Sequence, residues 1–323
     1  MPLPTYDDVA AAHVRIAPHI VRTPMLRNAR LDALTGGVVL LKAEPLQRTG
    51  SFKFRGATNA IRQLDAAALR GGVVAFSSGN HGQAVACAAA AVGASATIFM
   101  PADAPAIKAA STRAWGAEIV AYDRARDDRA ARARGFAERT GAALVPPFDH
   151  PHVIAGQGSM ALELARDADA AGLAMDALLV CTGGGGLIAG CALAIEGASP
   201  TTRVHPVEPE GWDDTTRSLL SGKREPAAGG SALCDALLAP TPGELTFAIN
   251  RTRLAAGIAV GDAEVFAAMV FAFTQLKLVL EPGGAVCLAA LLSGRFDARG
   301  RVVGAVLSGG NVDPAVFARA LAA

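Results

Sequence analysis

Short apolar runs alternate with longer alanine-rich segments along most of this chain of 323 residues. Each run has the length of a buried strand, and each segment between two runs is long enough for a helix that returns the chain to the same sheet. The pattern therefore predicts an α/β fold of βαβ units, with mostly parallel sheets flanked by helices. The expected strands cover residues 38–42, 73–76, 96–100, 118–122, 177–181 and 302–307.

A compact unit within this pattern indicates two domains. Residues 73–122 hold three of the expected strands with helices between them, and the turn-forming segment Pro146-Pro-Phe-Asp-His-Pro151 connects this unit to another body. The length of the chain also exceeds the usual size of one domain. We expect a small mobile domain at residues 72–149, inserted into a large domain made of residues 1–71 and 150–323.

The net charge of the chain is close to zero, with 30 Lys plus Arg against 29 Asp plus Glu. No basic stripe with interleaved aromatic residues is found, so nucleic acid is not an expected partner. Residues 177–195 reach membrane-spanning length, but the four consecutive glycines at their centre disfavour a helix in lipid. Five scattered cysteines without C-x-x-C spacing, and a beginning without signal-peptide features, indicate a reduced cytoplasmic protein with no membrane segment.

The first candidate site residue is Lys53, which stands between two phenylalanines just before a helical segment. Apolar surroundings lower the pKa of an ammonium group, and this makes the amine nucleophilic. A lysine in such a segment can equally lie along the surface with its charged end in water. The residue type alone leaves both interpretations open.

Two further polar segments follow predicted strands. Ser77-Ser-Gly-Asn-His-Gly-Gln83 comes after the strand at 73–76, and its hydroxyls and free N–H groups can bind a carboxylate or simply cap a helix. Ser308 comes after the strand at 302–307 and can offer a neutral hydroxyl to a ring nitrogen or belong to an ordinary turn. Because ligands bind at the carboxyl ends of strands in open α/β sheets, we expect these segments to converge.

Four consecutive glycines, Gly183 to Gly186, separate the strand at 177–181 from a helical segment. Such a loop lets the backbone wrap around a phosphate and aim its N–H groups at the oxygens. The loop lacks the spacing and the lysine of an ATP- or GTP-binding loop, but Gly184, Gly186 and Ala189 match a dinucleotide-binding pattern with Glu208 downstream. A nucleotide-binding oxidoreductase is therefore the alternative from a different functional class.

Taken together, these motifs resemble the serine/threonine dehydratase and serine racemase family of pyridoxal-phosphate (PLP) enzymes, whose fold is typified by the β subunit of tryptophan synthase. The resemblance runs from Tyr6 to Asp313, with the motifs in the family order. It implies that the large domain binds PLP and that the small domain closes over the substrate. It also implies that Lys53 holds PLP and accepts the α-proton, and that the other PLP contacts are Phe52, Asn80, Gly183, Gly184, Gly185, Gly186, Leu187 and Ser308.

The reaction that the resemblance implies is β-elimination from a small L-hydroxy-amino acid, giving a 2-oxo acid and ammonia. L-threonine and L-serine are the first candidate substrates, with the substrate carboxylate resting on Ser77, Ser78, Asn80 and His81. A neutral hydroxyl at Ser308 would not keep the PLP nitrogen protonated, which favours elimination over transamination. threo-3-Hydroxyaspartate stays open as a substrate, because the sequence does not say whether an arginine reaches the site.

Racemisation also stays open, because the resemblance places Ser78 opposite Lys53, where racemases return a proton. Two departures weaken the racemase interpretation: Glu44-Pro45 replaces the usual Glu-Asn, and Trp115 stands where racemases carry a tyrosine. A non-catalytic amino-acid-binding protein is a weaker alternative. Because the chain ends soon after Asn311, we expect no regulatory domain and no inhibition by isoleucine.

The resemblance further implies a divalent-cation site made of the carboxylates of Glu208 and Asp214 and the backbone carbonyl of Trp212. Ligation by oxygen alone suits Mg²⁺ or Ca²⁺, although an acidic loop can also be merely solvated. Glu281 stands where the family places a carboxylate near the PLP ring, or else in a plain turn between two helices. Relatives are commonly dimers, so we expect a homodimer.

Overall fold

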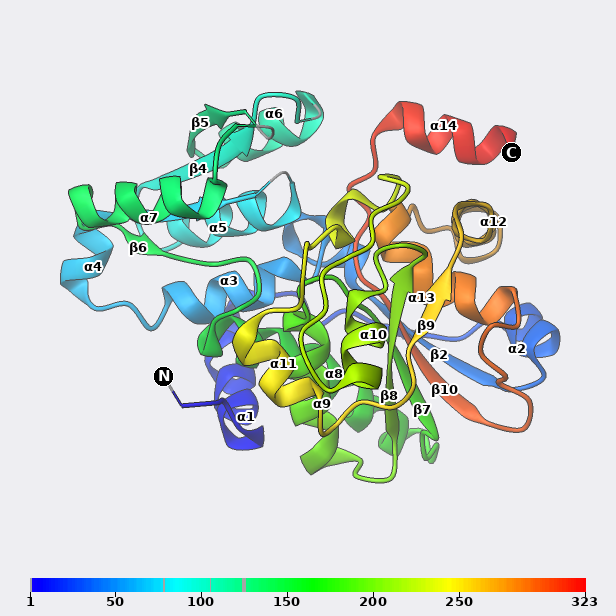
Figure 1. Ribbon diagram of the computed structural model, residues 1–323. Helices are drawn as coiled ribbons and strands as arrows, with labels where there is room; N and C mark the ends of the chain where they lie inside the picture. The colour runs from blue at the N-terminus through cyan, green and yellow to red at the C-terminus, as the bar shows by residue number, and fades with distance from the viewer. Residues whose placement is uncertain (1, 78, 105, 124–125) are drawn as a thin grey trace.

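The computed structural model describes residues 2–77, 79–104, 106–123 and 126–323, and its described strands form two sheets (Figure 1). In the six-stranded sheet, β1 is antiparallel to β2 and the other neighbours are parallel; its order is β1 (Met25–Leu26), β2 (Val38–Ala43), β10 (Val302–Leu307), β7 (Ala177–Cys181), β8 (Arg203–Pro209) and β9 (Ile258–Val260). The four-stranded sheet is parallel, in the order β5 (Glu118–Tyr122), β4 (Ala96–Pro101), β3 (Val73–Phe76) and β6 (Ala143–Leu144). These sheets confirm the predicted α/β fold.

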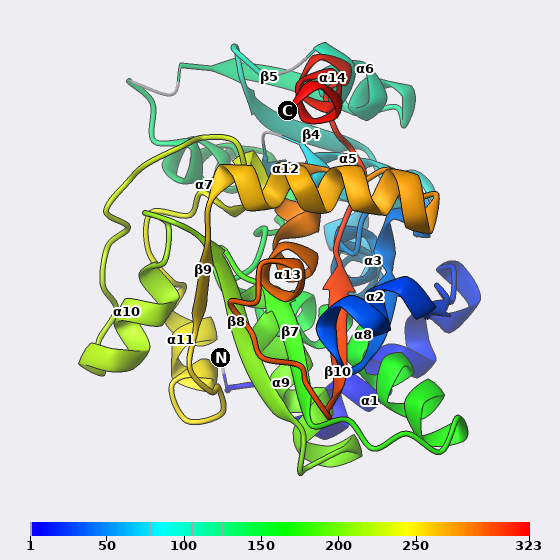
Figure 2. The same cartoon turned by 90° about the vertical axis from the view of Figure 1, so that its right-hand side faces the viewer.

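Helices cover both faces of the six-stranded sheet. α9 (Gly186–Ala198) joins β7 to β8, whereas α12 (Asp262–Phe271) and α13 (Pro282–Leu292) lie between β9 and β10, where the chain runs back across the sheet. Parallel crossovers are right-handed, so connections that run in opposite directions place their helices on opposite faces. α8 (Pro151–Ala170) packs on α9, and Figure 2 shows α13 in front of β7.

Every residue of β7 is buried, as expected for a parallel strand that is covered on both faces.

The remaining helices pack around these layers. None of the helices within the described ranges is both long and apolar enough to cross a bilayer. The other helices are α1 (Tyr6–Ile16), α2 (Ala29–Thr35), α3 (Lys53–Ile61), α4 (Ala66–Gly71), α5 (Asn80–Ala90), α6 (Ala106–Ala114), α7 (Arg129–Thr140), α10 (Asp214–Ser221), α11 (Glu244–Asn250) and α14 (Pro314–Ala322).

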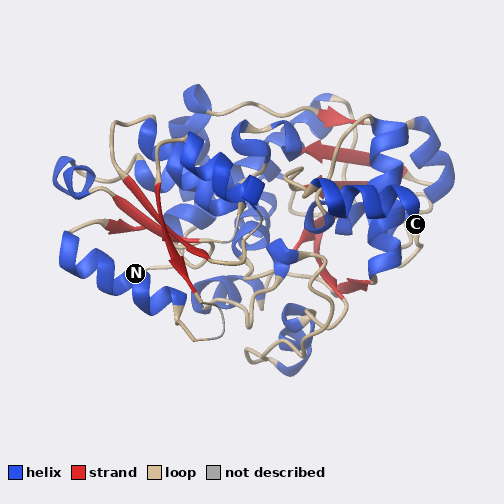
Figure 3. Ribbon diagram, turned by 90° about the horizontal axis from the view of Figure 1, so that it is seen from above, coloured by secondary structure: helices blue, strands red, loops and turns tan. Residues whose placement is uncertain are grey.

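The two sheets lie apart, and Figure 3 shows them as separate groups of strands with helices around each. All strands of the four-stranded sheet come from residues 73–144, and separate apolar clusters pack against the two sheets. These observations support our proposal of a small domain at 72–149 and a large domain at 1–71 and 150–323. α3 contacts both α5 and α8, so it lies where the two parts meet.

A buried group of four charged side chains fixes the start of α3. The Arg55 guanidinium contacts the Glu44 and Glu163 carboxylates at 2.8 and 2.9 Å, and the Lys42 ammonium contacts Glu163 at 2.6 Å. All four side chains are buried, and two positive charges balance two negative ones. Because Arg55 follows Lys53 by two residues, this network ties the lysine-bearing turn to β2 and α8.

Candidate active site

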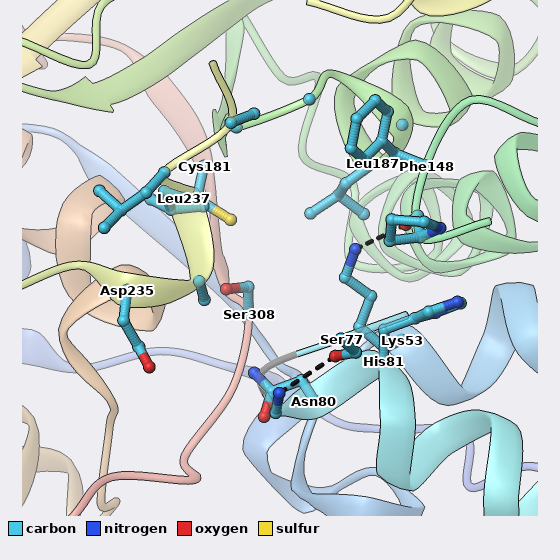
Figure 4. A pocket seen from close by; sticks show the side chains of 18 of the residues that line it. Lys53, Ser77, Asn80, His81, Phe148, Cys181, Leu187, Asp235, Leu237 and Ser308 are labelled. Carbon is cyan, nitrogen blue, oxygen red and sulfur yellow. Dashed lines mark hydrogen bonds between the residues drawn. The ribbon is translucent and has the colours of Figure 1, made fainter. Parts of the chain in front are cut away.

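A single cavity brings together the residues that the four sequence motifs singled out (Figure 4). It lies at the carboxyl ends of β3, β7 and β10, where an open α/β sheet binds its ligands. Ser78 falls outside the described residues, so its role stays a prediction. The predicted PLP and substrate residues that line the cavity are Phe52, Lys53, Ser77, Asn80, His81, Gly183, Gly184, Gly185, Gly186, Leu187 and Ser308.

Lys53 projects from the first turn of α3 into this cavity. Its Nζ donates a hydrogen bond to the carbonyl oxygen of Pro147 at 2.7 Å and lies 5.1 Å from the centre of the Phe52 ring. Burial lowers the pKa of the Lys53 ammonium to about 8. A useful fraction of the side chain is therefore the neutral amine near neutral pH, as a nucleophile or a base requires.

The glycine loop, residues 183–186, also lines the cavity and leads into α9. Gly185 has a φ of +88°, a left-handed conformation that side chains other than hydrogen disfavour. A Cβ atom at Gly184 would lie 2.5 Å from the Phe148 ring, and one at Gly183 would lie 3.1 Å from the Leu237 Cα. The loop therefore needs glycines, and the start of α9 offers backbone N–H groups for a phosphate.

Asn80, at the start of α5, is held by two polar side chains. Its Nδ2 donates a hydrogen bond to Glu281 Oε1, and its Oδ1 accepts one from Asn311 Nδ2 at 2.8 Å. Glu281 is buried directly before α13, and its Oε2 has no hydrogen-bond partner among the described residues. Glu281 thus lines the cavity. Of the two interpretations that the sequence left open, a carboxylate near the ligand or a plain turn, this position agrees with the first.

Burial raises the pKa of Glu281 to about 7 from its usual value near 4.5. The fold therefore favours the neutral acid: this group contributes stability below about pH 4.5, and the contribution is lost as the pH rises through about 7. In the unaltered protein, the free energy of unfolding should therefore fall by up to about 3 kcal/mol between these pH values because of Glu281. We expect this fall to be absent in Glu281→Gln. Urea unfolding of the cofactor-free protein checks this, with the exposed Glu138→Gln as control; an unchanged pH dependence in Glu281→Gln would contradict it.

The Ser77–His81 segment offers a hydroxyl and a helix start to the cavity. Gly79 N–H donates to Ser77 Oγ at 3.0 Å, so this hydroxyl already orders the turn. His81 Nε2 lies 2.8 Å from the Val145 carbonyl oxygen, and burial lowers the pKa of the ring to about 3. His81 is therefore neutral with its proton on Nε2, and it brings no positive charge to the cavity.

Two cationic side chains in the cavity were not found from the sequence. Lys108, from α6, is buried and contacts Asp235 at 2.6 Å, so its charge is balanced. Arg129, at the start of α7, lies over the Phe76 ring with its Cζ 5.7 Å from the ring centre. It forms no salt bridge with the residues that the structure describes, although the exposed Asp128 carboxylate interacts with its charge, and its side chain lines the cavity.

The predicted cation site is at the start of α10. Glu208 accepts hydrogen bonds from the Thr215 and Thr216 N–H groups, each at 2.9 Å, whereas both carboxylate oxygens of Asp214 are buried without a partner in the described structure. An orphaned buried carboxylate fits a bound cation. The described residues hold no cluster of three or more His, Cys, Asp or Glu side chains that could bind a metal, so the carbonyl of Trp212 would have to complete the site.

Comparison with known proteins agrees with this geometry. Residues 16–309 match the family model described as pyridoxal-phosphate dependent enzyme. The chain is 44% identical to L-threo-3-hydroxyaspartate ammonia-lyase from Pseudomonas sp, over 99% of each chain, and 40% identical to serine racemase from Schizosaccharomyces pombe, over 96% of this chain and 95% of the racemase. The solved structure of threonine deaminase from T.th. superimposes with a TM-score of 0.89 at 44% identity, over 96% of this chain and 99% of the deaminase.

The residues of the cavity also fit PLP: they include a buried amine of lowered pKa, a glycine loop at a helix start and a neutral hydroxyl at the end of β10. The dinucleotide interpretation of the glycine loop is therefore set aside. The chain belongs to the pyridoxal-phosphate-dependent enzyme family, among its ammonia-lyases and amino-acid racemases.

Proposed function

We propose that this enzyme eliminates water from L-threo-3-hydroxyaspartate, with L-threonine and L-serine as poorer substrates. A water molecule then hydrolyses the resulting imine, which releases ammonia and leaves the 2-oxo acid. The observation that carries this choice is Arg129, which lines the same cavity as Lys53 and forms no salt bridge within the described part of the chain. A substrate with two carboxylates needs two anion-binding places, and the Ser77–His81 segment and Arg129 supply them. A relative that covers nearly the whole chain is an L-threo-3-hydroxyaspartate ammonia-lyase, which supports the same choice.

In the proposed mechanism, the place of each residue in the cavity determines its role. PLP, when bound, supplies an electron sink for the charge left at Cα. The glycine loop and the start of α9 would hold its phosphate, Phe52 and Asn80 would contact the ring and its phenolic oxygen, and Ser308 would face the ring nitrogen as a neutral hydroxyl. Lys53 would hold PLP covalently until the substrate amine takes its place, and the freed, neutral Lys53 amine would then accept the α-proton.

The Lys108–Asp235 ion pair has a structural role in the proposed mechanism. It joins α6, which packs beside the four-stranded sheet, to residues on the other side of the cavity. A bridge at this place keeps the small domain against the large one and limits the entry of water. Racemisation would additionally need a proton donor opposite Lys53, for which Ser78 stays the candidate from sequence.

Steady-state kinetics with the purified enzyme test the proposal. Release of 2-oxo acid is measured with L-threo-3-hydroxyaspartate, L-threonine and L-serine, and D-serine formation is measured in the same samples. We expect kcat/KM for hydroxyaspartate to exceed the other two by about tenfold or more, the value of one charge-assisted contact. A higher kcat/KM for L-threonine would reject the dicarboxylic substrate, and D-serine as the main product would reject the lyase.

We also propose that Glu208, the Trp212 carbonyl and Asp214 bind Mg²⁺ or Ca²⁺. Adding either cation should then raise the Tm by about 3 °C or more in the unaltered enzyme. Asp214→Asn should abolish this increase, because the orphaned carboxylate supplies the charge that attracts the cation, while Asp213→Asn serves as the neighbouring control. Equal cation-dependent shifts in all three proteins would contradict the site.

A homodimer and a cytoplasmic location also stay predictions.

A further inference from the structure

Three consecutive residues, Pro147 to Asp149, connect the two walls of the cavity. The Pro147 carbonyl accepts the hydrogen bond from Lys53, and the Phe148 ring packs against the glycine loop. Asp149 has a different contact: its carboxylate reaches the first turn of α11, a helix nearly one hundred residues further along the chain. None of the sequence motifs contains this residue.

Asp149 caps α11 from outside that helix. Its Oδ2 accepts a hydrogen bond from Glu244 N at 3.0 Å, and its Oδ1 accepts bonds from Leu245 N at 2.9 Å and Thr246 N at 3.1 Å. The helix has Gly243 at its own N-cap, which supplies no side chain for this purpose. A Cβ atom at Gly243 would lie 2.4 Å from Asp149 Oδ1, so glycine there makes room for the carboxylate. A negative charge at this end of a helix is favourable.

The capped helix in turn holds the glycine loop. Thr246 Oγ1 donates a hydrogen bond to the Gly184 carbonyl oxygen at 2.8 Å, and the N–H of Gly243 donates to the same oxygen at 3.2 Å. Asn250 Nδ2 lies 3.5 Å from the Gly185 carbonyl oxygen, which also accepts the shorter helical hydrogen bond of α9 from Ala189 N at 2.9 Å. Because the C=O and N–H of a trans peptide point in opposite directions, fixing the Gly184 carbonyl toward α11 aims the N–H group of Gly185 away from it.

We propose that Asp149 is a positioning residue for the phosphate group of the cofactor. It fixes α11, α11 fixes the carbonyl of Gly184, and this carbonyl fixes the direction of the N–H group of Gly185, which lines the cavity. This inference rests on the proposed binding of PLP at the glycine loop. It predicts that Asp149 acts on the phosphate and not on the ring or on the Lys53 amine.

The test compares PLP with pyridoxal, which lacks the phosphate, as ligands of the cofactor-free enzyme. Fluorescence titration gives Kd for both ligands with the unaltered protein, Asp149→Ala, Asp149→Asn and Thr246→Val. We expect Asp149→Ala to raise Kd for PLP about tenfold or more while Kd for pyridoxal changes less than about threefold. Thr246→Val should do the same, and Asp149→Asn should lose less, because one oxygen remains for Leu245 and Thr246.

Asp65→Ala is the matched control, because Asp65 caps α4 through Ala67 N and Ala68 N at 2.9 and 2.8 Å and lies outside the cavity. It should leave both Kd values unchanged. Two results would overturn the inference. One is an equal increase in Kd for PLP and for pyridoxal in Asp149→Ala, and the other is an unchanged Kd for PLP in both Asp149→Ala and Thr246→Val. The Kd of the unaltered protein for PLP, from the same titration, tests the proposed cofactor site separately. Should Asp149→Ala not fold, Asp149→Asn and Thr246→Val carry the comparison.

Discussion

Replacement of Lys53 by alanine is expected to lower kcat/KM by about 10³-fold or more, because a positioned base alone contributes a factor of this order. The variant should also lose the visible absorption band of lysine-bound PLP. The reason is local: within the cavity, Lys53 offers a buried amine whose pKa is lowered to about 8, whereas the charge of Lys108 is committed to Asp235. Release of 2-oxo acid and the absorption spectrum measure the two effects.

The control for Lys53 is Lys223→Ala, an exposed lysine that pairs with Glu225 at the surface. Its activity and spectrum should match those of the unaltered enzyme. Lys53→Arg keeps the positive charge but cannot serve as a neutral amine, so it should be as inactive as Lys53→Ala. Turnover by either Lys53 variant at more than about a tenth of the normal rate would show that another group removes the proton.

Arg129→Gln is expected to change the choice of substrate. Loss of one charge-assisted contact should lower kcat/KM for L-threo-3-hydroxyaspartate by about 10-fold to 100-fold. The value for L-threonine, which has no second carboxylate, should change by less than about threefold. The measurement is release of 2-oxo acid from both substrates by the same preparations.

Arg126→Gln is the control for Arg129, because Arg126 is an exposed arginine just before α7 that contacts Asp123. It should leave the preference between the two substrates unchanged. A similar loss for both substrates in Arg129→Gln would mean that Arg129 supports the fold or the closure of the small domain. In that case the proposed second carboxylate site would have to be abandoned.

The parts of the site that sequence could predict are those in which one residue type has few uses. Four consecutive glycines after an apolar strand indicate a close approach of the backbone to a ligand, and the structure places them on the wall of the cavity beside Phe148 and Leu237. Asn80 and Ser308 were found because each belongs to a short motif that follows a strand, and strand ends converge in a parallel sheet. Lys53 was found because it stands between two phenylalanines just before a helical segment.

The parts that sequence could not predict depend on packing between distant segments. Arg129 begins an ordinary charged helix, and only the position of α7 over Phe76 brings it to the cavity. Asp149 stands in a turn-rich connection, and its partner α11 comes far later in the chain. Neither residue lies in a motif, because the local sequence carries no sign of a contact made across so many residues.

Strand β8 shows a similar limit for the fold. Its sequence, Arg203-Val-His-Pro-Val-Glu-Pro209, contains charges and two prolines, which argue against a strand with neighbours on both sides. The structure nevertheless places it between β7 and β9, and Glu208 ends up buried at the start of α10. Pairing with the wholly apolar β7 overrides the local preference of these residues.

The most direct test of the central claim is to identify the lysine that carries the cofactor. The enzyme is incubated with PLP, reduced with borohydride, digested and analysed by mass spectrometry. The account predicts the added pyridoxyl phosphate group on the peptide that contains Lys53, with Lys42 and Lys108 unmodified. Modification of another lysine, or the absence of any modified peptide, would contradict the assignment of Lys53 and with it the proposed lyase chemistry.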